Sequence, residues 1–209
     1  MNQEALQDAT EADEVADDAP ATWADALLDL LGATARHVAL LAACVAMGGS
    51  LFFSEVLGWP PCVLCWYQRI LMYPLAVILT IGILRRDRGV HLYVLPLSIF
   101  GAGVSLYHYL LIKTNWFPPP ACSAGIPCTV DYLNWFGFIN IPFLALTAFL
   151  IITVMMVAWA LIWQDAGEPA DEEPEEAAPA PRWLDGSRMA VLMIIVAVVL
   201  AYLVGSTFV

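Results

Sequence analysis

Five long apolar runs constrain this chain more than any other feature of its sequence. A hydrocarbon core about 30 Å thick takes roughly 20 helical residues to cross. Runs of about that length extend from Val38 to Leu57, Cys65 to Leu84, Leu92 to Ile112, Ile139 to Trp163 and Met189 to Phe208. The chain is 61% hydrophobic and 13% charged, which exceeds what a soluble core of 209 residues needs. The sequence therefore predicts an all-α integral membrane protein.

The net charge of −12 belongs to two short segments of the chain. Nine of the 20 acidic residues lie in residues 4–29 and eight in residues 165–185, which leaves Glu55, Asp87 and Asp131. Segments rich in Glu, Pro and Ala cannot bury enough apolar surface to offset the entropy of ordering. We interpret the acidity as a property of solvated tails, and we expect no nucleic-acid partner.

The composition divides the chain into five parts. We expect an acidic disordered tail over 1–21, an amphipathic helix along the membrane surface over 22–36, a membrane domain over 37–163, an acidic Pro/Glu-rich linker over 164–188 and a fifth transmembrane helix over 189–209. The first 21 residues lack the basic start and apolar stretch of a secretory signal.

The Lys and Arg residues predict the orientation in the membrane, because short loops rich in them stay in the cytoplasm. When the spans are counted along the chain, six of the eight Lys and Arg residues fall on the same side of the membrane. Arg69 and Lys113 fall toward the other side. The six are Arg36, Arg85, Arg86, Arg88, Arg182 and Arg188. The amino terminus is therefore expected in the cytoplasm, with the loops after the first and third spans outside.

Cys62 and Cys65 form a Cys-x-x-Cys pair that opens the second span. Pro60 and Pro61 suit the start of a helix, because proline at the first position loses no hydrogen bond. Free amide groups and the helix dipole stabilise a thiolate there, and the thiolate is the reactive form in disulfide exchange. The pair is set up for redox cycling, with a static disulfide or half of a zinc site as alternatives.

Arg69 lies four residues after Cys65, so one helical turn separates them on the same face. An arginine inside an apolar span costs several kcal/mol unless it snorkels to the headgroups or has a partner. It either stabilises a Cys65 thiolate and negative charge on a reduced acceptor, or it snorkels.

A second pair, Cys122 and Cys128, lies in the outward loop "PPPACSAGIPC". A local disulfide across this gap is geometrically easy, and it would be either a staple or a relay that a partner protein can reach. A zinc site built from all four cysteines is a weaker alternative, and no metal is expected. Cys44 stands alone in the first span and is interpreted as a small buried apolar residue.

His108 lies in the outer third of the third span, level with Arg69 if both helices are straight. It either contacts a bound acceptor or carries its protons, or it packs against a hydrogen-bonded neighbour. Aromatic residues flank the outer loop: Trp116, Phe117, Tyr132, Trp135 and Phe136. Most are expected in an interfacial belt, with one or two lining a pocket for a ring.

Together the stretches "PCVLCWYQRI", "YHY" and "PCTVDYLNWFGFINIPFLALTAF" resemble the disulfide bond formation protein B family (DsbB), in its compact BdbC-like branch. The resemblance covers about Ala39 to Trp163. It implies a four-helix transmembrane bundle, to which this chain adds a C-terminal transmembrane helix, in a bacterial inner (cytoplasmic) membrane. It also implies a protein-disulfide:quinone oxidoreductase that reoxidises an extracytoplasmic DsbA-like thioredoxin-fold thiol oxidase and reduces ubiquinone or menaquinone from the membrane pool.

The resemblance also implies a role for each cysteine. Cys122 and Cys128 would take electrons from the partner, Cys128 would attack Cys62, and Cys65 would be left as the thiolate that reduces the quinone. Arg69 matches the family's quinone-side arginine, and His108 is a looser match as a cofactor-binding residue. The closely spaced loop cysteines, the acidic linker and the fifth span depart from the family pattern.

Two other classes of protein share some of these features. Vitamin K epoxide reductases also couple a loop pair to a membrane Cys-x-x-Cys, but their loop pair comes first in the chain, whereas here the Cys-x-x-Cys comes first. A non-enzymatic membrane protein with static disulfides would have redox-inert cysteines and no bound quinone.

Overall fold

The computed structural model describes residues 23–114, 116–117, 126–165 and 186–208. The expected acidic tail over 1–21, Cys122 and most of the expected linker lie outside these residues.

The described chain consists of membrane-length helices joined by short connections. They are α2 (Trp23–Leu51), which continues into the π-helical turn η1 (Phe52–Val56), then α3 (Val63–Leu84), α4 (Val90–Lys113), α5 (Ile141–Asp165) and α6 (Gly186–Thr207). Five helical segments of the described residues are long and apolar enough to cross a membrane. The predicted class, an all-α integral membrane protein, is confirmed.

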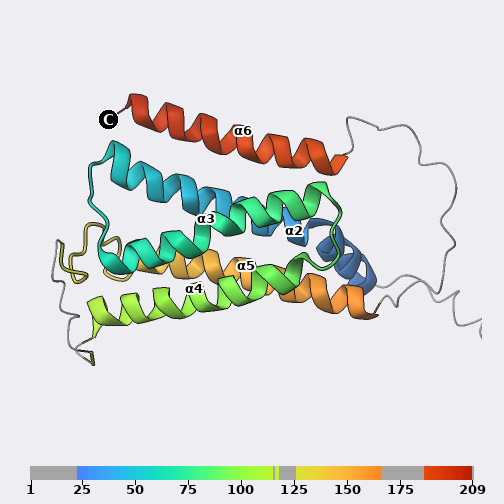
Figure 1. Cartoon of the computed structure of the whole chain (residues 1–209), viewed down its shortest axis with the longest axis horizontal. Helices are drawn as coiled ribbons and strands as arrows, with labels where there is room; N and C mark the ends of the chain where they lie inside the picture. Colours follow the sequence, from blue (N-terminus) through green and yellow to red (C-terminus); the bar gives the residue numbers. More distant parts are fainter. Residues whose placement is uncertain (1–22, 115, 118–125, 166–185, 209) are drawn as a thin grey trace, which may run out of the picture.

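Helices α2 to α5 pack into a bundle, and α6 lies on its outside (Figure 1). Helix α2 packs against α3 and α5, and α4 packs against the same two helices. Helix α6 packs mainly against α2, with fewer contacts to α3 and η1. The bundle is therefore complete without α6.

Close packing between α4 and α5 depends on small residues. A Cβ atom added to Gly101 on α4 would lie 2.2 Å from the Phe149 ring of α5, and Phe149 is fully buried. Because lipid is as apolar as the side chains, helices in a membrane associate through such close contacts. The core continues along the bundle through Leu40, Leu79 and Trp159.

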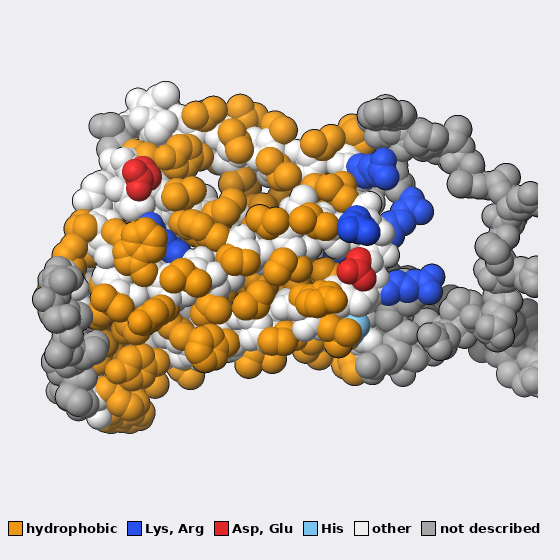
Figure 2. All heavy atoms as spheres, in the orientation of Figure 1, with side chains coloured by type: hydrophobic (Ala, Val, Ile, Leu, Met, Phe, Trp, Pro, Cys, Tyr) orange, Lys and Arg blue, Asp and Glu red, His pale blue; other side chains and the backbone are white. Residues whose placement is uncertain are grey.

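The outer surface is largely apolar, and its charged side chains gather mainly at one end (Figure 2). Figure 2 shows hydrophobic side chains across the middle of one face, with most of the visible Lys and Arg gathered at the end where the α3–α4 loop lies. That loop carries Arg85, Arg86 and Arg88. The amino end of α3, with Cys62, lies at the opposite end of the bundle (Figure 1). The structure thus separates the basic loop from the cysteines.

The amino-terminal helix differs from the expectation. Helix α2 runs without a break from Trp23 to Leu51, so the expected surface helix over 22–36 and the first span form one helix. The connecting stretch "LGATARH" holds no proline, and its single glycine is tolerated inside a helix. The boundary expected at residue 36 therefore has no helix break to mark it.

Candidate functional site

The Cys-x-x-Cys pair sits at the amino end of α3, after the connection from η1. Gly58 has a φ of +65°, a conformation that glycine adopts without strain, and it ends the turn that follows η1. Cys62 is the N-cap of α3, with extended backbone, and its sulfur accepts a hydrogen bond from the Cys65 amide at 3.4 Å. Both prolines therefore precede the helix cap. Cys62 is the cap itself and not a residue of the first turn.

The two sulfur atoms of the pair are in direct contact. Cys62 Sγ donates a hydrogen bond to Cys65 Sγ over 3.1 Å. This bond, followed by burial, raises the pKa of the Cys62 thiol to about 12. Cys62 is therefore the protonated member of the dithiol at neutral pH, and Cys65 is the sulfur that receives a hydrogen bond.

Arg69 turns toward the carboxyl end of α2. Its guanidinium donates to the backbone carbonyl of Ser50 at 2.8 Å and lies 5.5 Å from the centre of the Trp66 ring. Its buried Nε has no hydrogen-bond partner among the described residues. A buried donor without a partner is costly, so this atom is available to a ligand in the adjoining cavity.

A cavity of about 420 Å³ lies beside Cys65, between α2, α3 and α5. Gln68, Arg69 and Tyr73 from α3 contribute polar groups beside Cys65, while α2 and α5 contribute mostly apolar side chains. The size and the few convergent polar groups are typical of a site for a small organic ligand. The predicted neighbours Cys65 and Arg69 therefore share one cavity wall.

Three stacked aromatic rings form another part of that wall. Phe53 of η1 stacks on Trp59, with centroids 5.5 Å apart and planes at 18°, and Trp59 stacks on Tyr132 at 5.6 Å and 11°. All three line the cavity. Tyr132 is the one residue of the predicted aromatic belt that does so.

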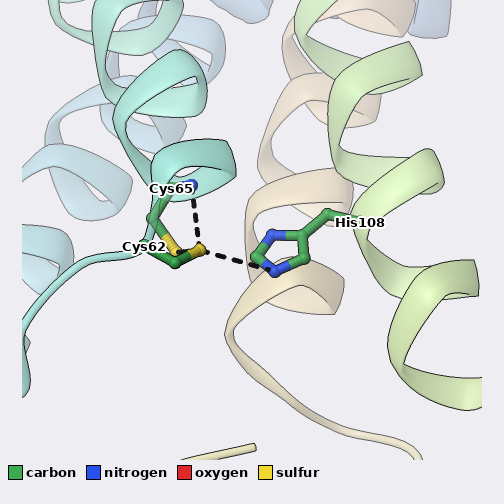
Figure 3. A group of neighbouring side chains, drawn as sticks. All are labelled: Cys62, Cys65 and His108. Atoms are coloured by element: carbon green, nitrogen blue, oxygen red, sulfur yellow. Dashed lines mark hydrogen bonds between the residues drawn. The ribbon is translucent and has the colours of Figure 1, made fainter. Parts of the chain in front are cut away.

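His108 approaches the cysteines from α4 (Figure 3). Its Nε2 lies 3.8 Å from Cys62 Sγ and 3.1 Å from the Cys128 carbonyl oxygen, and its Nδ1 lies 3.4 Å from Gln68 Nε2. His108 does not line the larger cavity, but it lines a second, smaller one together with Cys62 and Cys65. Its expected contact with a cofactor stays a prediction, and its observed neighbours are the Cys62 sulfur, the Cys128 carbonyl and the Gln68 amide.

The structure brings together three of the four predicted redox cysteines. Cys128 and Cys62 belong to one buried cluster, against which Cys65 packs. The loop that carries Cys128 is held to the end of α4 by an ion pair of 3.2 Å between Asp131 and Lys113. The position of Cys122 lies outside the described residues. Cys44, as expected, is buried in the core of the bundle.

The geometry also bears on the zinc alternative. The ligand atoms of Cys62, Cys65 and His108 lie within 4.8 Å of one another, so this group could hold a metal ion. Two thiolates on tetrahedral zinc, with Zn–S bonds of about 2.3 Å, lie about 3.8 Å apart. The separation of 3.1 Å between the two sulfurs fits a dithiol better.

Gln68 and Ser50 are site residues that the sequence analysis missed. Gln68 lies three residues after Cys65, a spacing that places it on the same helix face as Cys65 and Arg69. That spacing, together with the rarity of amides in an apolar span, was a usable signal. Ser50 contributes only its backbone carbonyl, so no residue type marks it.

Comparison with known proteins supplies the family. A sequence model described as "Disulfide bond formation protein DsbB" matches residues 33–163. The chain is 51% identical over 121 residues to disulfide bond formation protein C of Bacillus subtilis, covering 57% of this chain and 88% of that protein.

Two further relatives give the same result. A probable disulfide formation protein C of Halalkalibacterium halodurans is 55% identical over 115 residues, or 54% of this chain and 84% of the relative. A probable disulfide formation protein of Oceanobacillus iheyensis is 48% identical over 130 residues, or 61% and 88%. No solved structure matches the chain. Helix α6 lies outside the matched residues.

Proposed function

Because the chain belongs to the DsbB family of disulfide bond formation proteins, we propose that it is a membrane thiol:quinone oxidoreductase. In this proposal it reoxidises an extracytoplasmic, DsbA-like thioredoxin-fold thiol oxidase. The family itself implies membrane disulfide bond formation by an oxidoreductase. The electron acceptor, the partner and the residue roles are the proposed part.

One observation carries the proposal: Cys65 and Arg69 lie in the wall of the same cavity. The flat aromatic stack of Phe53, Trp59 and Tyr132 suits a planar ring, and the apolar remainder suits an isoprenoid tail. The buried Nε of Arg69 is a hydrogen-bond donor for a ring carbonyl or for negative charge on a reduced ring. A bound quinone would supply an acceptor for two electrons and two protons.

The cysteines would pass the electrons in two exchanges. Attack by the partner on Cys122 would release Cys128 as a thiolate, which then attacks Cys62 of the Cys62–Cys65 disulfide. The bond between Cys62 and Cys65 breaks, a bond between Cys62 and Cys128 forms, and the electron pair leaves on Cys65. A second thiol of the partner would then attack the mixed disulfide, so that the oxidised partner leaves and Cys122 is released. Cys122 would attack Cys128, the bond between Cys128 and Cys62 would break, and Cys62 would leave as a thiolate. Cys62 and Cys65 would then re-form their disulfide as two electrons pass to the acceptor in the cavity.

The redox potentials give this route its direction. An oxidase of the DsbA type has a potential near −120 mV, and for a two-electron couple about 30 mV corresponds to about 1.4 kcal/mol. A quinone is a suitable final acceptor for so oxidising a dithiol. The acceptor would be ubiquinone or menaquinone from the membrane pool.

The proposed location is a bacterial cytoplasmic membrane, with the amino terminus inside and the cysteine loops outside. Arg85, Arg86 and Arg88 lie at the end of the bundle opposite to Cys62, which supports this orientation by the positive-inside rule. All the curated relatives named above are bacterial.

Quinone reduction by the purified protein tests the proposed function. With a reduced thioredoxin-fold donor, the wild-type protein should turn over quinone in detergent, which absorbance follows. Cys65→Ser should abolish turnover, and Cys44→Ser is the matched control that should retain it. If several donors and both quinones give no turnover while the cysteines stay oxidised, the disulfides are structural and the proposal is wrong.

A further inference from the structure

A buried polar chain links the cavity to the exchanging cysteines. Gln68 on α3 and His108 on α4 are only 6% and 2% exposed. Gln68 lines the larger cavity, and its amide nitrogen faces His108 Nδ1 at 3.4 Å. His108 Nε2 faces the Cys128 carbonyl at 3.1 Å and Cys62 Sγ at 3.8 Å. The described residues thus join helix α3, helix α4 and the cysteine loop through one imidazole ring.

The partners of the ring fix where its proton lies. A backbone carbonyl can only accept a hydrogen bond, so Nε2 must carry a hydrogen to bond Cys128. In the neutral ring Nδ1 is then an acceptor, and it receives a bond from the Gln68 amide. Nε2–H then points at Cys128 and Cys62.

We propose that Gln68 is a positioning residue, which holds the His108 ring so that Nε2–H faces both the Cys62 sulfur and the Cys128 backbone. The ring thereby places the loop cysteine beside the membrane pair for disulfide exchange. This inference rests on the proposed function, because it assigns roles within the exchange between Cys128 and Cys62.

The ring has a chemical task in that exchange as well as a structural one. Negative charge builds on the Cys62 sulfur when Cys62 leaves as a thiolate, as the loop disulfide is regenerated. A donor at 3.8 Å from that sulfur stabilises this charge, and no proton is transferred in that step. Without Gln68, the buried Nδ1 loses its partner and the ring can turn about its side-chain bonds.

The tautomer of His108 is the first test, and it needs neither quinone nor partner. The chain has three histidines, so nitrogen-15 NMR of the histidine-labelled full-length protein in detergent gives few signals. His108→Asn identifies the signal of His108 by its loss. The expected result is a ring with its hydrogen on Nε2, and a neutral ring protonated on Nδ1 would overturn the proposal.

The second test measures how well Cys62 and Cys128 are held together. In full-length protein carrying Cys65→Ser and Cys122→Ser, these two cysteines can pair, and glutathione buffers measure the stability of their disulfide. Gln68→Leu should lower its equilibrium constant roughly 3- to 10-fold, the worth of one net hydrogen bond. Gln68→Asn, which keeps an amide donor on a side chain one methylene shorter, should lose less than Gln68→Leu.

Equal equilibrium constants for the Cys62–Cys128 disulfide, with Gln68 unchanged and in both Gln68 variants, would overturn the positioning role. The thermal transition of each variant shows whether it is folded, and the NMR result on unsubstituted Gln68 stands in any case. Since no quinone is present, a failure here leaves the proposed quinone reaction intact. A protein that passes both tests but reduces no quinone would instead refute the proposed function.

Discussion

At the scale of single residues, the spacing of side chains along α3 determines which of them face the cavity. Cys65, Gln68 and Arg69 fall at i, i+3 and i+4, and all three line the cavity. The positions of Cys65 and Arg69 could be predicted because a cysteine pair and a charge are conspicuous in an apolar span. The bond from Arg69 to Ser50 could not be predicted, because it depends on how α2 ends against α3.

Substitution of Arg69 should weaken quinone binding. Arg69→Met removes a charge-assisted hydrogen bond, typically worth about 1.5–3 kcal/mol, so KM for quinone should rise roughly 10- to 100-fold. Arg69→Lys keeps the charge without the planar fork and should give a smaller rise. Arg85→Met, at the other end of the bundle, is the control. A KM for Arg69→Met within experimental error of wild type would contradict the assignment.

The reactivity of Cys62 should depend steeply on pH. Because its hydrogen bond to Cys65 and its burial raise the pKa of Cys62 to about 12, its thiolate fraction should increase about tenfold per pH unit through pH 11. Cys65→Ala removes the largest cause of the shift, so the pKa falls and alkylation at pH 9 should be faster. Mass spectrometry after timed alkylation of the reduced protein measures both rates. A rate that levels off below pH 9 in the reduced wild-type protein would contradict this assignment.

At the scale of elements, the lengths of the apolar runs predicted the helices well and the junctions between them poorly. Helices α3 and α4 begin within two residues of the expected starts at Cys65 and Leu92. The π-helical turn η1 and the unbroken start of α2 were not foreseen. The pattern of apolar residues indicates which part of a helix is buried in lipid. It does not show whether the helix bends at the membrane surface or continues straight.

The contact between α4 and α5 should not tolerate a larger residue at Gly101. Its added Cβ would lie 2.2 Å from the Phe149 ring, so Gly101→Ala should lower the free energy of unfolding by about 1–3 kcal/mol. Gly103→Ala is a matched control on the same helix, because nothing lies within 4 Å of its added Cβ. Thermal unfolding in detergent compares the two. A smaller loss for Gly101→Ala than for Gly103→Ala would argue against this packing.

At the scale of the whole molecule, a four-helix redox domain carries a fifth helix along α2. Near one end His37 Nε2 and Ser187 Oγ lie 3.3 Å apart, and near the other Phe52 and Tyr202 make an edge contact with centroids at 6.3 Å. Between them Val198 packs against Gly48. The apolar run predicted this helix, but its partner could not be predicted, because every span offers an apolar face.

Removal of α6 should affect stability more than activity. A chain ending at Asp165 keeps every residue that lines the cavity, so quinone turnover should stay within roughly threefold of the full chain, about 0.7 kcal/mol in the barrier. Its thermal transition should fall, because the core loses the packing of Val191 and Val198. A folded truncated chain with no turnover would show that α6 takes part in the reaction.

The most direct test of electron transfer from the cysteines to quinone is single turnover by the membrane pair, Cys62 and Cys65, alone. Full-length protein carrying Cys122→Ser and Cys128→Ser would be reduced, freed of reductant and mixed anaerobically with quinone. Absorbance would follow the quinone, and alkylation would count the remaining thiols. If the membrane pair reduces quinone directly, each protein should consume one quinone while the thiols of Cys62 and Cys65 disappear together. Unchanged ubiquinone and menaquinone, with both thiols still present, would contradict direct reduction.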